Sequence, residues 1–232
     1  RLCEKMVLGN RRAIRPCEAG AGSSLRGPRA ATCRSCASLS QNGWTLASKP
    51  TIYIVCSDRH RNGKTLLARV LVDYLMLDGK DPFIIDATFP EGPLRAAFPG
   101  RTALVDFSQI QGQMKVFDTI LGSSGRDYVI DLPAPKTEYF FKTLKELDFQ
   151  SEALKAGFQI VVLFIVDKEY ASLNAAEDIR TLVAPSLLVN VRNQHVGSIL
   201  DQQTYGLTLD MPVLDRDIVP LIEDKRFSLR AF

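Results

Sequence analysis

The alternation of two kinds of segment after residue 50 constrains the fold of this chain more than any other feature. Five short apolar runs fit buried strands, and the stretches between them carry apolar residues at helical spacing. The predicted strands are 51–57, 81–88, 127–134, 158–167 and 186–193, and the predicted helices are 64–77, 108–121, 137–149 and 171–183. Repeated strand–helix units predict an α/β fold with three α/β/α layers, in which helices cover both faces of a mostly parallel sheet.

The first 48 residues differ in composition from the rest of the chain. Residues 1–50 hold nine of the 29 Lys and Arg residues but only two of the 26 Asp and Glu residues, so the net charge of +3 originates there. This stretch is rich in Gly, Ser, Ala and Arg and cannot bury enough apolar surface to fold. We therefore predict a basic, disordered leader over 1–48 and one folded domain over 49–232. A transit peptide, or a tail that contacts nucleic acid or anionic lipid, is an alternative interpretation of the leader.

The tripeptide Gly63-Lys64-Thr65 lies between the first predicted strand and the first predicted helix. In a phosphate-binding loop, the glycine lets backbone amides approach a phosphate, the lysine neutralises phosphate charge, and the threonine hydroxyl holds Mg²⁺. The positive end of the following helix adds to such a site. A simple surface turn before a helix is the alternative interpretation.

Acidic residues end two further predicted strands. Asp131 ends "YVID", where a carboxylate can hold Mg²⁺ through water beside the phosphates. Asp86 ends "FIID" and can orient or activate an attacking water, or assist the metal. Parallel strands place their carboxyl ends at one edge of the sheet, which is where such folds bind ligands. Each acid can instead cap a strand or a helix.

This order of features resembles the ParA/MinD family of P-loop ATPases, including its division-positioning and mobilisation relatives. The likeness rests on the G-K-T loop, "IID", "VIDLPA", a very apolar strand and a late strand with asparagine, and it covers nearly all of 51–232. It implies the P-loop NTPase fold of the SIMIBI class, a deviant Walker A loop, and bound ATP and Mg²⁺. It also implies nucleotide contacts from Asn62, Gly63, Lys64, Thr65 and Leu66, Mg²⁺ at Thr65 and Asp131, and catalytic roles for Lys64, Asp86 and Arg59.

The front half of the loop departs from the family pattern K-G-G-x-G-K-[ST]. Arg59 stands where the family has a lysine that reaches the nucleotide of a dimer partner, and His60 and Arg61 stand at the two glycines. Arg59 keeps the positive charge, and its planar fork suits phosphate. Asp58 lies where a general phosphate loop has glycine, so it needs Arg59 or Arg61 as an ion-pair partner. The departures predict nucleotide binding with slow hydrolysis.

The family places an asparagine near the nucleotide base, with a proline-containing loop beside it. Asn190 and Asn193 are the two candidates in "LLVNVRN", and Pro212 is the matching proline. Either asparagine can instead satisfy the backbone of a turn. The sequence does not separate the two.

The resemblance implies an ATP-dependent dimerisation switch with slow Mg²⁺-dependent hydrolysis, which positions or partitions a cargo such as a plasmid, a chromosome or the division machinery. A homodimer and a protein that stimulates turnover are the implied partners. Two other classes of function remain open: a non-hydrolysing adaptor with a degenerate loop, and a small-molecule kinase or ligase on the same fold. The segment "SDRHRN" favours the adaptor.

Two partner surfaces have only weak support in the sequence. Acids outnumber bases after residue 50, so the domain lacks a strong footprint for nonspecific DNA, although Lys136, Lys142, Lys145 and Lys155 can form a local patch. No apolar run approaches the ~18 residues of a membrane span. The C-terminal "IVPLIEDKRFSLRAF" is short and mixed in charge. We therefore expect a cytoplasmic protein without membrane association.

Overall fold

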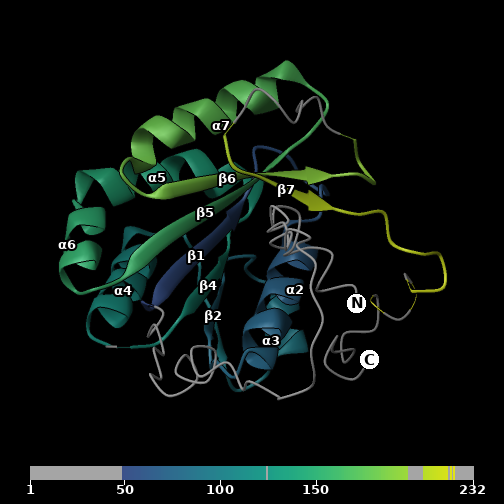
Figure 1. Ribbon diagram of the computed structural model, residues 1–232. Coiled ribbons are helices and arrows are strands. Elements are labelled where there is room, and N and C mark those ends of the chain that lie inside the picture. The colour runs from purple at the N-terminus through teal and green to yellow at the C-terminus, as the bar shows by residue number, and fades with distance from the viewer. Residues whose placement is uncertain (1–48, 124, 198–205, 219, 221, 223–232) are drawn as a thin grey trace, which may run out of the picture. The chain divides into compact units, whose positions relative to one another are not determined.

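The structure is a computed structural model that describes residues 49–123, 125–197, 206–218, 220 and 222. The predicted leader, 1–48, lies outside the described residues, and so does most of the chain after residue 218. From Lys49 onward, the described chain is built around one sheet with helices on both sides (Figure 1).

In the described part of the chain, seven parallel strands form the sheet in the spatial order β3-β2-β4-β1-β5-β6-β7. They are β1 (Thr51–Cys56), β2 (Phe83–Asp86), β3 (Thr102–Leu104), β4 (Tyr128–Asp131), β5 (Gln159–Val166), β6 (Leu187–Asn193) and β7 (Thr208–Met211). The chain fills one side of β1 with β2 to β4 and then crosses to the other side with β5. The carboxyl ends of all described strands therefore lie along the same side of the sheet. The carboxyl end of β1 lies near the middle of that side.

Helices cover the two faces of the sheet (Figure 1). One face carries α2 (Lys64–Leu77) and α3 (Pro93–Ala97), whereas the other carries α4 (Ile110–Leu121), α5 (Thr137–Glu146), α6 (Phe149–Lys155) and α7 (Tyr170–Val183). A short 3-10 helix, Ala134–Lys136, precedes α5. None of the helices in the described ranges is long and apolar enough to cross a membrane.

Strand β5 explains why a continuous apolar run folds as a central strand here. Successive side chains of a strand point to opposite faces of the sheet. Phe164 and Val166 therefore join the apolar cluster beneath α4 to α7, while Leu163 and Ile165 join the cluster beneath α2 and α3. Because both faces are covered, every position along the strand favours an apolar residue.

The predicted fold class is confirmed, but the sequence patterns missed five short elements of the described chain: α3, β3, the 3-10 helix, α6 and β7. The predicted helix 137–149 is interrupted before α6, where Asp148 adopts a φ of 48°. Strand β3 has three residues, too few to show a period. Strand β7 is an edge strand that contains a charged residue, Asp210. The carboxylate of Asp210 accepts a hydrogen bond from the guanidinium of Arg192 on β6 at 2.7 Å.

Candidate functional site

The loop Ser57–Gly63, which follows the central strand β1, encloses the side chain of Lys64. The Lys64 ammonium donates to the backbone carbonyl of Arg59 and, at 3.2 Å, to Oδ1 of Asn62. The Asn62 side chain is buried and donates to the hydroxyl of Ser57. Burial lowers the pKa of Lys64, and the carboxylate of Asp131 opposes this effect. The loop thus holds a buried ammonium at the start of α2.

The start of α2 is suited to bind an anion. Helix α2 begins at Lys64, and within the described chain no side chain caps its first turn. The first amides of a helix lack partners inside the helix and carry partial positive charge. An anion that approached the loop would therefore meet both these amides and the Lys64 ammonium.

Gly63 joins the loop to α2 in a conformation that favours glycine. Its φ is 96°, and a Cβ at this position would lie 2.7 Å from Nδ2 of Asn193 and 3.0 Å from Cε of Met211. The ends of β6 and β7 therefore pack directly against the loop. Both the backbone angle and the available space exclude a side chain here.

Replacing Gly63 with alanine should destabilise the domain by about 2–4 kcal/mol, because the new methyl group meets the Asn193 side chain while the backbone stays in a left-handed conformation. Thermal unfolding followed by circular dichroism measures this loss. Gly100→Ala is the matched control, since Gly100 also has a positive φ, 85°, but nothing lies within 4 Å of the added Cβ. Equal losses for the two variants would contradict a tight contact between the loop and β6.

Thr65 and Asp131 form the second part of the site. Thr65 Oγ1 donates to Asp131 Oδ2 at 2.7 Å. The other carboxylate oxygen, Oδ1, is buried without a hydrogen-bond partner among the described residues. Burial raises the pKa of Asp131 from 3.8 to about 6, and the charge of Asp86 adds to the increase. A buried carboxylate oxygen without a donor, beside a threonine hydroxyl, fits the chemistry of Mg²⁺.

The carboxylate of Asp86 is engaged in local structure. Asp86 lies opposite Asp131 on the neighbouring strand. Its Oδ1 accepts from the backbone amide of Thr88 at 3.0 Å and from the Thr88 hydroxyl. Its Oδ2 accepts from the amides of Leu94 and Arg95 at 2.8 and 3.2 Å. These contacts favour the capping role that the sequence left as an alternative, because the carboxylate fixes the turn after β2 and the start of α3.

Arg59 lies within a cluster of acidic side chains. Its guanidinium contacts Asp58 at 3.3 Å, Asp167 at 3.7 Å and Glu169 through a short ion pair. Asp58 also accepts from the hydroxyl of Ser172 on α7 at 2.7 Å. The ion pair that Asp58 requires is therefore present. Arg59 in turn ties the loop to the segment between β5 and α7.

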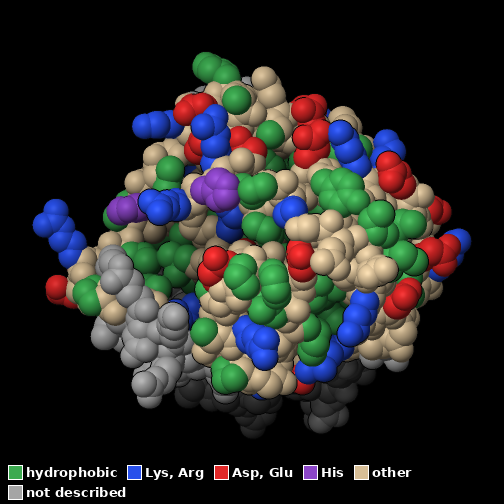
Figure 2. Space-filling view, turned by 180° about the vertical axis from the view of Figure 1, so that it is seen from behind, with side chains coloured by type: hydrophobic (Ala, Val, Ile, Leu, Met, Phe, Trp, Pro, Cys, Tyr) green, Lys and Arg blue, Asp and Glu red, His purple; other side chains and the backbone are tan. Residues whose placement is uncertain are grey.

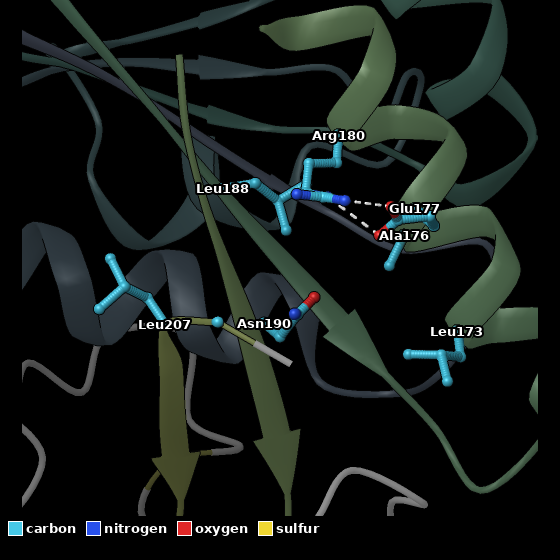
Figure 3. Close-up of a pocket in the computed structure, with 8 residues that line it drawn as sticks. Leu173, Ala176, Glu177, Arg180, Leu188, Asn190 and Leu207 are labelled. Atoms are coloured by element: carbon cyan, nitrogen blue, oxygen red, sulfur yellow. Dashed lines mark hydrogen bonds and ion pairs between the residues drawn. The ribbon is translucent and has the colours of Figure 1, made fainter. Parts of the chain in front are cut away.

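The two candidate asparagines of β6 lie in different places. Asn193 ends the strand, and its Nδ2 donates to the backbone carbonyl of Asn62 at 2.9 Å. Asn190 lines a cavity of about 170 Å³ between α7, β6 and the residues Gly206 and Leu207 that precede β7 (Figure 3). An ion pair between Arg180 and Glu177 of α7 borders the same cavity. The structure therefore brings Asn193, and not Asn190, to the loop.

The remaining predicted residues lie at the margins of the site. Leu66 is half-buried against the apolar cluster beneath α2, and Pro212 follows β7 directly. His60 and Arg61 are exposed at the tip of the loop. Figure 2 looks onto the face that shows both histidines of the chain, and basic, acidic and apolar side chains are interspersed there.

Sequence reasoning missed several residues that shape the loop. Ser57 is fully buried, and its hydroxyl accepts from the Arg59 amide at 3.1 Å. Thr137, at the start of α5, donates to the Ser57 carbonyl at 3.0 Å. Asp167 and Glu169 follow the apolar run of β5. For Ser57 and Asp167 the available signal was their place directly after a buried strand, which is close to the signal that selected Asp86 and Asp131.

Comparisons with known proteins find distant structural likenesses. No family model matches the chain. No curated protein matches it either. A nucleotide-binding protein from Archaeoglobus fulgidus, solved in complex with ADP, is 16% identical with a TM-score of 0.46, covering 76% of this chain and 86% of that one. A plasmid partition protein from Borrelia burgdorferi is 10% identical with a TM-score of 0.38, covering 76% of this chain and 95% of that one. Because both TM-scores lie below 0.5, these two likenesses do not establish a function for this chain.

Proposed function

We propose that residues 49–232 form a nucleotide-binding domain that takes ATP with Mg²⁺ and acts as a ParA/MinD-like switch. The observation that carries the proposal is the convergence of three side chains at the uncapped start of α2: the buried ammonium of Lys64, the hydroxyl of Thr65 and the buried carboxylate of Asp131. Phosphate-binding loops use these groups for the β- and γ-phosphates and for Mg²⁺.

Each group has a separate task in this proposal. Lys64 exchanges its contacts with Arg59 and Asn62 for phosphate oxygens, and the amides of Gly63 to Thr65 donate to the same phosphates. Thr65 and Asp131 hold Mg²⁺, the carboxylate acting through water. When bound, Mg²⁺ neutralises part of the phosphate charge. The burial of Lys64 and Asp131 strengthens their electrostatic contacts with the ligand.

Arg59 supplies the dimer-dependent part of the proposed switch. In a single chain its guanidinium contacts Asp58, Asp167 and Glu169, yet its side chain remains 41% exposed. In a dimer formed with ATP, Arg59 leaves Glu169 and donates to the nucleotide of the partner, as the signature lysine does in the family. Hydrolysis is slow in this proposal, because the acids around Arg59 compete with the phosphates for its guanidinium.

A non-hydrolysing adaptor is the second candidate, and two observations favour it. The buried side chain of Asn62 fills the interior of the loop, and Asp86 accepts four hydrogen bonds from its own surroundings. An adaptor would bind ATP weakly or not at all and would keep the fold for protein contacts. It requires no water-activating acid.

The proposed partners of the switch are a second copy, a cargo and a protein that stimulates turnover. Nonspecific DNA has less support from the side chains. Of the four lysines in the predicted patch, Lys142 pairs with Glu138 at 2.6 Å and Lys155 pairs with Glu152 at 2.8 Å. These pairs reduce the positive charge available to phosphates.

Equilibrium binding and light scattering together test the proposal. Fluorescent ATP titrated with and without Mg²⁺ should bind only with the metal, and molar mass should double with a non-hydrolysable ATP analogue but not with ADP. Binding without a change of mass would refute the dimerisation switch. Absence of binding under both conditions would refute the nucleotide site and support the adaptor.

A further inference from the structure

The side chain of Asn193, at the end of β6, makes two hydrogen bonds, and the residue is 4% exposed. Its Nδ2 donates to the backbone carbonyl of Asn62 at 2.9 Å. Its Oδ1 accepts from the backbone amide of His195 at 3.0 Å. The side chain is therefore fixed between the turn that follows β6 and the loop that follows β1.

The contact with Asn62 determines how one peptide of the loop is oriented. In a planar trans peptide, the C=O and the N–H point in opposite directions. Since the Asn62 carbonyl points to Asn193, the amide of Gly63 points away from β6. Gly63 also lies directly against Asn193, because a Cβ added to Gly63 would be 2.7 Å from Nδ2 of Asn193.

The fixed peptide lies next to the groups proposed to contact phosphate. Gly63 directly precedes Lys64, and Asn62 accepts from the Lys64 ammonium at 3.2 Å. A rotation of the peptide between Asn62 and Gly63 would move the Asn62 carbonyl and the Gly63 amide together. It would also change the backbone angle of Gly63, which directly precedes the first residue of α2.

We propose that Asn193 is a positioning residue for the phosphate-binding loop, and that it acts through the Asn62 carbonyl instead of contacting the nucleotide base. This inference rests on the proposed nucleotide site. It differs from the base contact that the family resemblance implied for either Asn190 or Asn193. Asn193 therefore affects the binding of the triphosphate group, which nucleoside triphosphates and inorganic triphosphate have in common.

The comparison of ATP with inorganic triphosphate, both with Mg²⁺, separates the two roles. For Asn193→Leu, which keeps the approximate size of the side chain without its amide, we expect affinity for both ligands to fall by the same factor, about tenfold. A loss for ATP with unchanged affinity for inorganic triphosphate would establish a base contact and overturn the proposal. Unchanged affinity for both ligands would overturn it too.

Hydrogen exchange of the nucleotide-free protein tests the same role without a ligand. In Asn193→Leu and in Asn193→Ala, the amides of residues 57–63 should exchange faster, while β4 and β5 stay protected. His195→Ala is the matched control, because the side chain of His195 is exposed and only its backbone amide contacts Asn193. Unchanged exchange in the loop would refute the positioning role. If the two variants exchange faster but the wild-type protein binds neither ATP nor inorganic triphosphate, the nucleotide site alone is refuted.

Discussion

Replacing Lys64 with alanine should weaken the binding of Mg²⁺-ATP at least about 100-fold, because it removes the buried ammonium that faces the proposed phosphate site. Charge-assisted hydrogen bonds contribute roughly 1.5–3 kcal/mol each, and a lysine between two phosphates makes two of them. Titration of fluorescent ATP measures the loss. Lys64→Arg should recover only part of the affinity, since the loop encloses an ammonium and not a planar fork.

The control for Lys64→Ala removes the same charge elsewhere. Lys115 is exposed on α4, so Lys115→Ala should leave the affinity for ATP within about twofold of wild type. Because Lys64 also contacts Arg59 and Asn62, the melting temperature of Lys64→Ala must be measured alongside. Wild-type affinity in a folded Lys64→Ala protein would refute the proposed site.

Replacing Asp131 with asparagine should have opposite effects on stability and on ligand binding. Burial raises the pKa of this carboxyl to about 6, so folding favours the protonated form. The stabilisation from that proton is fully present below the unfolded pKa of 3.8 and is lost as the pH rises through 6. At pH 7.5, Asp131→Asn should therefore be more stable than wild type by roughly 2–3 kcal/mol.

The sign of this effect can be tested by unfolding both proteins in metal-free buffer at several pH values. The two stabilities should approach each other near pH 4 and diverge between pH 4 and pH 6. In a separate titration, Asp131→Asn should lose the effect of Mg²⁺ on ATP affinity, since an amide is a weaker ligand than a carboxylate. A less stable variant at pH 7.5 would contradict the buried, partly unsatisfied carboxylate.

Lys64, Thr65 and Asp131 could be selected as candidates from the sequence because the patterns that select them are local. Lys64 and Thr65 belong to the Gly-Lys-Thr motif between a predicted strand and a predicted helix, and Asp131 ends an apolar run. The role of Asp86 depends instead on donors from Leu94 and Arg95, which lie in the five-residue helix α3. A helix of that length leaves no periodic pattern, so capping was one alternative for Asp86 but its donors could not be identified from the sequence.

The surroundings of Arg59 and the asparagines of β6 depend on distant parts of the chain. Glu169 is 110 residues from its partner Arg59, and only the adjacency of β1 and β5 brings them together. Asn190 and Asn193 are three residues apart, so a strand directs them to opposite faces. Which face meets the loop follows from the strand order of the sheet, and no pattern within β6 contains that information.

The contacts around the loop after β1 have a consequence for the thermodynamics of binding. Three neighbouring segments hold the loop: Thr137 binds the carbonyl of Ser57, Glu169 binds Arg59, and Asn193 binds the carbonyl of Asn62. The conformational entropy of the loop is thus already lost when the domain folds. A ligand that fits this shape would not lose that entropy again on binding, so the proposed nucleotide would need fewer phosphate contacts to reach a given affinity.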